Sequence, residues 1–69
     1  MDLSAYLKSR GRAAALAREL DVSPATVSRW ASGGRTPSPQ NCVRIERLTQ
    51  GAVRRKNLRA DWRRVWPEL

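Results

Sequence analysis

Arginine dominates the side chains of this 69-residue sequence that could do chemistry. Lysine and arginine number 14 against 6 acidic residues, a net charge of +8, and 12 of the 14 are arginine. Arginine pairs with phosphate and can fork onto O6 and N7 of guanine. Histidine is absent and cysteine occurs once, which excludes a Ser–His pair and argues against a zinc site. We therefore expect binding of nucleic acid, rather than a basic surface that serves only solubility, with no catalytic residue, metal or cofactor.

One of these arginines lies on a predicted helix that has two different faces. Ser23 as N-cap and Pro24 in the first turn predict a helix that runs to Ser32. At about 100° per residue, one face gathers small side chains and one arginine: Ala25, Ser28, Arg29 and Ser32. The opposite, apolar face carries Val27, Trp30 and Ala31. Such a helix can dock on its apolar side while its other side approaches a partner closely.

The segment before this helix predicts the support on which it docks. Apolar residues follow a helical period there, at Ala13, Leu16, Ala17 and Leu20. Between the two helices, Asp21 is expected in the left-handed conformation, which aspartate tolerates better than most residues. Val22 is the apolar plug of the turn. Residues 13–32 therefore predict two short helices joined by a tight turn.

The apolar positions of this unit match the phage-repressor helix-turn-helix at Leu16, Ala17, Leu20, Val22, Val27 and Trp30. On these residues the chain resembles the Cro/YdaS-like group of phage and prophage regulators, of the lambda repressor-like family. The similarity continues at Cys42, Ile45, Glu46, Thr49, 51–53, Leu58, Arg59, Asp61, Trp62 and 66–69. Asp21 stands where the turn usually has glycine, and Ala60 where a proline is expected. The resemblance implies one all-α domain over residues 1–69, a bundle of about five short helices.

The resemblance also implies which residues face double-stranded DNA. The matching positions are Ser23, Ala25, Thr26, Ser28 and Arg29. Arg29 is expected to read a base in the major groove, and Ala25 to touch a thymine methyl. The hydroxyls are better suited to phosphate or mixed contacts, those of Ser23, Thr26 and Ser32.

Two further arginines are expected at the DNA backbone. Arg12 opens the first helix of the motif, whose N-terminus abuts DNA in this family and favours phosphate. We expect Arg12, together with Arg10, to replace a glutamine contact that Ala13 lacks. Arg35 lies in the loop after the second helix. This loop is either a plain connector or a loop over the phosphates. The second interpretation is favoured because the loop directly follows the second helix and Arg35 adds a cation.

Helices are also expected on both sides of the motif. One covers about residues 2–10, is capped by Asp2 or Ser4 and ends at Gly11. Another begins at Ser38–Pro39 or Thr36–Pro37 and reaches about Gln50. Its predicted inner face carries Cys42 (a small buried hydrophobe), Ile45, Leu48 and Thr49. Arg44 and Arg47 are expected to form a solvated outer face.

The last segment is expected to close the bundle. Val53 and Leu58 are predicted core residues. Asp61 is the expected N-cap of a short final helix, with Trp62, Val65 and Trp66 on one side. The two tryptophans can pack on the chain's own bundle or form a dimer interface, since interfaces are rich in tryptophan and arginine.

The resemblance implies a Cro-like phage or prophage repressor that occupies an operator. A small monomer covers a short half-site, so we expect a homodimer, at least on DNA, bound to a pseudo-palindrome with half-sites about 34 Å apart. One cysteine, no signal peptide and no long apolar run predict a cytoplasmic protein of a bacterial host, at the nucleoid when bound and without a membrane segment.

Two alternatives keep the same helices. An antitoxin-like or activating regulator differs in its circuit rather than its chemistry. A protein-interaction module would dock the basic helix on an acidic protein surface. The small outer face of residues 24–32 argues against the module, because a docking helix usually presents larger apolar anchors.

Overall fold

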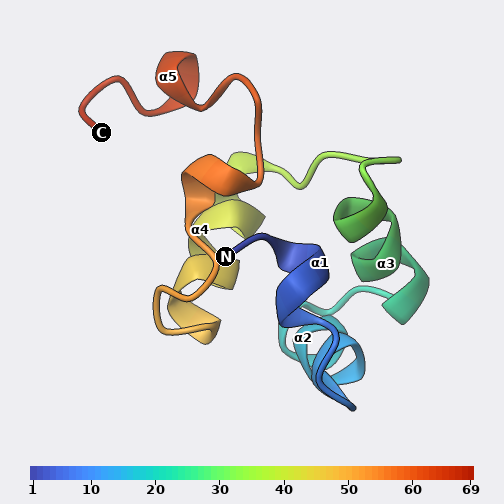
Figure 1. Cartoon of the computed structure of the whole chain (residues 1–69). Coiled ribbons are helices and arrows are strands. Elements are labelled where there is room, and N and C mark those ends of the chain that lie inside the picture. Colours follow the sequence, from blue (N-terminus) through green and yellow to red (C-terminus); the bar gives the residue numbers. More distant parts are fainter.

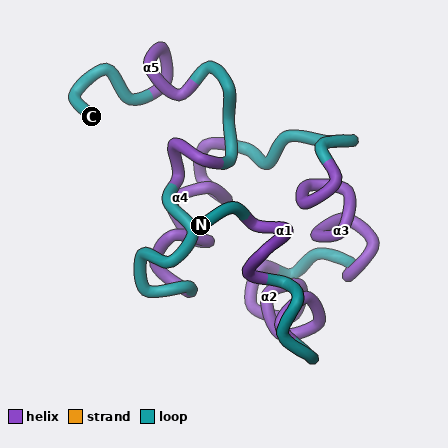
Figure 2. The backbone as a smooth tube through the Cα atoms, in the orientation of Figure 1, coloured by secondary structure: helices purple, strands orange, loops and turns teal.

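Five α-helices and one short 3-10 helix make up the chain, and the computed structural model describes all of residues 1–69. Figure 2 shows helices joined by loops, with no strand. The helices are α1 (Leu3–Tyr6), α2 (Arg12–Leu20), α3 (Pro24–Ser32), α4 (Pro39–Leu48), η1 (Arg55–Asn57) and α5 (Trp62–Val65). The predicted all-α fold of about five helices is confirmed. No helix is both long enough and apolar enough to cross a membrane.

The first helix is much shorter than the predicted range of residues 2–10. Asp2 does cap it, because its Oδ1 accepts a hydrogen bond from the Ala5 N–H at 2.8 Å. After Leu7, however, the Lys8 N–H bonds back to the Ala5 carbonyl at 3.3 Å, and the chain turns. Residues 8–11 are all exposed, so no packing supports further helical turns, and short helices depend on such packing.

The turn between α2 and α3 has the predicted geometry. Asp21 adopts φ 57° and ψ 45°, the left-handed conformation. The Val22 N–H reaches the Ala17 carbonyl at 3.0 Å, and the Asp21 N–H reaches the Arg18 carbonyl at 3.3 Å. These two bonds form a Schellman motif, which closes the helix end and sends the chain into α3. The two helices lie side by side in Figure 1.

The core lies where α1, α2, α4 and the segment after α4 meet. Its central cluster is made of Leu3, Leu16, Leu20, Ile45 and Val53, each at most 4% exposed. Val22, Trp30 and Leu58 pack against this cluster from the outside, among other half-buried side chains. The predicted core positions Val53 and Leu58 are therefore confirmed, and the core holds α3 through its apolar face.

Helix α4 begins at Pro39, and its inner face differs at one position from the prediction. Cys42 and Ile45 are fully buried, and burial raises the pKa of the Cys42 thiol to about 11. Leu48 is 39% exposed, whereas Thr49 is 6% exposed. The correction at Leu48 has a simple cause: α4 ends there, and the turn that follows carries Thr49 inward instead.

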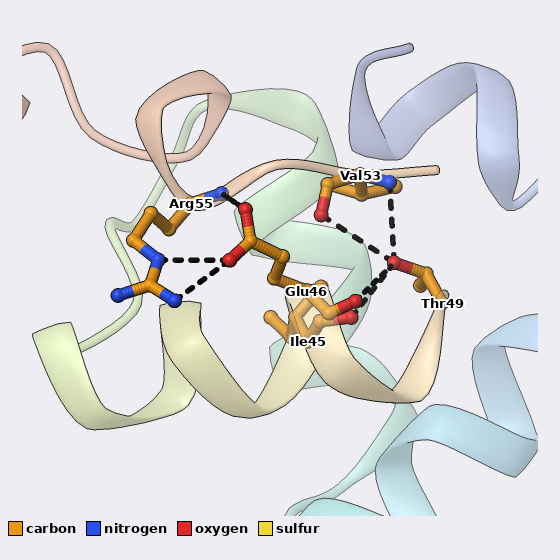
Figure 3. Close-up of polar contacts among 5 residues, drawn as sticks. All are labelled: Ile45, Glu46, Thr49, Val53 and Arg55. Atoms are coloured by element: carbon orange, nitrogen blue, oxygen red, sulfur yellow. Dashed lines mark hydrogen bonds and ion pairs between the residues drawn. The ribbon is translucent and has the colours of Figure 1, made fainter. Parts of the chain in front are cut away.

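Thr49 joins the end of α4 to the segment that leads to η1 (Figure 3). Its Oγ1 donates to the Ile45 carbonyl at 2.8 Å and accepts from the Val53 N–H at 3.1 Å. The hydroxyl thereby satisfies a buried backbone group, which is costly to leave unpaired. This contact fixes the path of the chain from α4 to Val53.

Arg44 is not only part of a solvated face, as predicted. Its Nη2 donates to the Glu19 carbonyl at 2.7 Å, near the C-terminal end of α2. A cation at that end is favoured by the helix dipole. Arg44 therefore ties α4 to α2, while Arg47 stays exposed as expected.

The C-terminal segment places α5 at the opposite end of the molecule from α2 (Figure 1). Asp61 occupies the predicted N-cap position of α5, but its side chain makes no capping hydrogen bond. Its two carboxylate oxygens bind Arg59 instead, at 2.8 Å to Nε and 3.0 Å to Nη2. The paired guanidinium occupies the oxygens that would cap α5, so the predicted N-cap position is confirmed without its side-chain hydrogen bond. Trp66 is 8% exposed and therefore packs on its own chain, while Trp62 is half-buried.

Candidate nucleic-acid interface

Helix α3 carries the predicted face on the outside of the molecule. Val27 is fully buried, and Trp30 and Ala31 pack against the core cluster. The residues on the opposite side are exposed: Ala25, Ser28, Arg29 and Ser32. The Arg29 side chain has no hydrogen-bond or ion-pair partner within the chain, while its backbone carbonyl closes the helix end. Its guanidinium is therefore available to an outside ligand.

The start of α3 uses two of the predicted contact residues for itself. Ser23 Oγ accepts the Thr26 N–H at 3.2 Å, and the two hydroxyl oxygens lie 2.9 Å apart. Thr26 is half-buried, so it is less accessible than the sequence suggested. One of the two hydroxyl protons is used in the hydrogen bond between Ser23 and Thr26. Only the other hydroxyl can therefore donate to a phosphate.

Ser32, at the other end of α3, is also engaged. Its Oγ donates to the Arg29 carbonyl at 3.1 Å. The side chain is exposed, but its one proton already serves the helix end. The Ser32 hydroxyl can thus accept a hydrogen bond from a ligand. To donate one to a phosphate, it must first break its hydrogen bond to the Arg29 carbonyl.

Arg12, at the start of α2, rests on the aromatic ring of Tyr6, a contact that the sequence did not predict. The guanidinium lies 4.2 Å from the centroid of Tyr6, and Nη1 donates to the Tyr6 carbonyl at 3.1 Å. Cation–π contact and this hydrogen bond orient the side chain beside the N-terminus of α2. No local pattern signals the pair, because α1 and α2 are separated by an irregular turn.

The loop after α3 brings Arg35 to an open groove. Gly33 has φ 84°, and the Gly34 N–H reaches the Arg29 carbonyl at 2.9 Å, so a second Schellman motif ends α3. Arg35 follows directly and is exposed. It lines a groove of about 480 Å³ together with residues of η1 and the segment before α5. Lys56, one of these residues, was not among the predicted site residues because it lies far along the chain.

None of the cations of this surface, Arg12, Arg29 and Arg35, forms an ion pair with a carboxylate of the chain. The two ion pairs of the chain join Glu46 to Arg55 at 2.7 Å and Asp61 to Arg59 at 2.8 Å. The hydrogen bond from Arg59 lowers the pKa of the Asp61 carboxyl, which therefore stays ionised. No three histidine, cysteine or acidic side chains come together as a metal site would require. The candidate interface is thus a cationic surface.

Comparison with known proteins assigns the family. A family model described as "Bacterial toxin YdaS" matches residues 3–65, nearly the whole chain. The chain belongs to the YdaS family. It is 43% identical over 51 residues to the Escherichia coli K12 protein named "Putative transcriptional regulator YdaS". That match covers 74% of this chain and 52% of the relative, so the chain spans about half of the relative's length.

The family assignment confirms the YdaS-like resemblance and extends beyond the helix-turn-helix. The matched range includes every predicted contact residue between Arg12 and Arg35. It also includes η1 and α5, and hence Lys56 on the far side of the groove. The family model therefore covers the C-terminal segment as well as α3.

Proposed function

We propose that this YdaS-family protein is a transcriptional regulator that binds double-stranded DNA with α3 in the major groove. The observation that carries the proposal is the outer face of α3, where small exposed side chains surround an unpartnered Arg29. Small side chains let the helix backbone approach base edges, and arginine can fork onto guanine. The name of the Escherichia coli relative supports a regulatory role.

Each predicted residue receives a role in this proposal. Arg29 reads a base, Ala25 touches a thymine methyl, and the small Ser28 lets the helix approach the bases closely. Arg12 and Arg35 bind phosphates on either side of the major groove. The remaining hydroxyls, of Ser23, Thr26 and Ser32, contribute mixed contacts and hold the ends of α3. Such a protein acts at the nucleoid of a bacterial cell.

The short length of α3 supports binding as a homodimer. Nine residues span about 13 Å along a helix axis, enough for only a short run of base pairs. Two copies on a pseudo-palindrome, with half-sites about 34 Å apart, would double the number of bases read. A Cro-like protein in this arrangement represses by covering a promoter.

The test is selection from a random duplex library at near-physiological salt, read out by sequencing. Enrichment of an inverted repeat, with half-sites about one helical turn apart, supports a dimeric operator-binding regulator. Weak binding that depends steeply on salt and enriches no sequence contradicts sequence-specific regulation. In that case a protein partner with an acidic surface becomes the better account of the basic helix.

The description of the family as a bacterial toxin favours a second candidate function, inhibition of growth. The same α3 face would then act on host DNA when the protein is overproduced. Expression of the wild type and of Arg29→Ala in a bacterial host separates the possibilities. Growth arrest that needs Arg29 supports toxicity through DNA binding, and normal growth with the wild type contradicts it.

A further inference from the structure

The groove beside the end of α3 carries cations on both of its walls. The α3 side contributes Trp30, the end of the helix and Arg35. The other wall is formed by η1 and the segment before α5, with Lys56 and Arg59. No carboxylate lines the groove. Ser32 and Arg35 belong both to this groove and to the candidate interface of α3, so the two surfaces are continuous.

Trp62 contacts one of the cations on the far wall, Lys56, and also Arg63, which lies outside the groove. The Lys56 ammonium lies 6.0 Å from the centre of the Trp62 ring system, and the Arg63 guanidinium lies 5.1 Å from it. Contact of a cation with an aromatic face restrains a long, otherwise mobile side chain. The Trp62 ring thus serves as a platform for Lys56 at the edge of the groove.

Only some of the cations in the groove are available to bind a ligand. Arg59 is bound by Asp61 and also donates to the Pro37 carbonyl at 2.8 Å. Lys56 and Arg35 make no ion pair and are both exposed. Two cations without an ion pair therefore line one open groove from segments far apart in the sequence.

We propose that this groove, with Lys56 and Arg35 on its two walls, binds the sugar-phosphate backbone of the duplex whose major groove receives α3. The proposal rests on the proposed DNA-binding function and adds the C-terminal segment to it. Charge complementarity selects a polyanion, and the continuity with α3 selects the same duplex. Backbone contacts fix the orientation of the reading helix without carrying sequence information themselves.

The experiment compares variants of the full chain on duplex DNA at several salt concentrations. Lys56→Ala removes the free cation, and Lys56→Arg restores a charge on the Trp62 platform. Arg47→Ala is the matched control, because Arg47 is exposed on α4 and does not line the groove. Fluorescence anisotropy on the selected duplex and on a scrambled duplex gives the dissociation constants, and thermal melting verifies that each variant folds.

The expected result is a uniform loss of affinity in Lys56→Ala on both duplexes. The slope of log K against log salt should become shallower by about 0.9, the value for one lost phosphate contact. Lys56→Arg should recover the wild-type slope, and Arg47→Ala should keep it. Replacing the contacted phosphate by a neutral methylphosphonate should weaken the wild type and leave Lys56→Ala unaffected.

Two results overturn the proposal in different ways. A wild-type slope in Lys56→Ala, with base reading through Arg29 intact, rejects the groove and leaves the proposed function standing. An equal loss in Arg47→Ala also rejects the groove, because net charge alone would then explain the effect. Absence of duplex binding by the wild type rejects both the groove and the proposed function.

Discussion

The carboxylate of Glu46 in α4 holds both the side chain and the backbone of Arg55 in η1. Its Oε1 accepts from Arg55 Nε at 2.9 Å and lies 2.7 Å from Nη2, and its Oε2 accepts the Arg55 N–H at 3.2 Å (Figure 3). The same guanidinium lies 5.6 Å from the centre of the Trp66 ring system. One acidic side chain thus connects α4 to η1 and, through Arg55, to the C-terminal segment.

Glu46→Gln should therefore lower the free energy of unfolding by about 1–2 kcal/mol at neutral pH, because a charged acceptor is replaced by a neutral one. Glu19→Gln is the control, since the Glu19 carboxylate is exposed and makes no ion pair. Chemical denaturation followed by tryptophan fluorescence measures both. Equal stabilities of the two variants would show that the contact contributes nothing.

The Glu46 contact also predicts a pH dependence. Partial burial raises the pKa of this carboxyl, but the hydrogen bonds from Arg55 outweigh it, and the pKa lies below the ordinary 4.5. The unfolded chain therefore takes up this proton first as the pH falls, so stability is lost from about pH 4.5 downward, through the lowered folded pKa. Glu46→Gln should lack this part of the acid destabilisation in denaturation curves at successive pH values. A variant that follows the wild-type curve would contradict the assignment.

Asp21→Gly should stabilise the protein. Asp21 has φ 57°, a conformation that costs side-chain-bearing residues energy, and its negative charge follows the C-terminal end of α2, where anions are unfavourable. We expect a gain of about 0.5–1 kcal/mol, which raises Tm by about 2–8 °C. Asp21→Ala keeps a β-carbon at the same φ and should melt below the glycine variant. A glycine variant that melts below the wild type would mean that the Asp21 side chain supports the turn.

Arg29→Ala should weaken binding to the selected duplex by about 1–3 kcal/mol and relax the preference at one base pair. Arg29→Lys keeps the charge but loses the planar fork, so it should retain the salt dependence while losing the base preference. Competition assays with duplexes altered at single positions measure both properties. If Arg29→Ala weakens binding equally to all sequences, Arg29 is a phosphate anchor instead of a base reader.

Arg12→Ala should make the salt dependence of binding shallower by about 0.9, through loss of one phosphate contact. The variant also loses the contact with Tyr6, so thermal melting must accompany the binding measurement. Tyr6→Leu is the informative partner, because it keeps the Arg12 charge and removes only the ring beneath it. We expect that variant to keep the slope and bind somewhat more weakly. An unchanged slope in Arg12→Ala would remove Arg12 from the phosphate contacts.

The sequence by itself determined the all-α fold and the helix-turn-helix. Periodicity, the Ser23 cap and Pro24 located α3, and the composition of the turn indicated the left-handed Asp21, because these signals act within a few residues of one another. The family resemblance was also readable from the spacing of its apolar residues. Burial of Cys42 and Val53 followed from the same patterns.

Only the tertiary structure decided the contacts between segments distant in the chain. The support of Arg12 by Tyr6, the reach of Arg44 to α2, and the engagement of Asp61 by Arg59 leave no periodic signal. The length of α1 depended on packing that ends at Leu7, and the exposure of Leu48 on where α4 stops. The groove shared by Arg35 and Lys56 exists only because residues 56–62 lie opposite the C-terminal end of α3 and the loop that follows it. Long-range packing sets these distances, and local sequence patterns do not encode them.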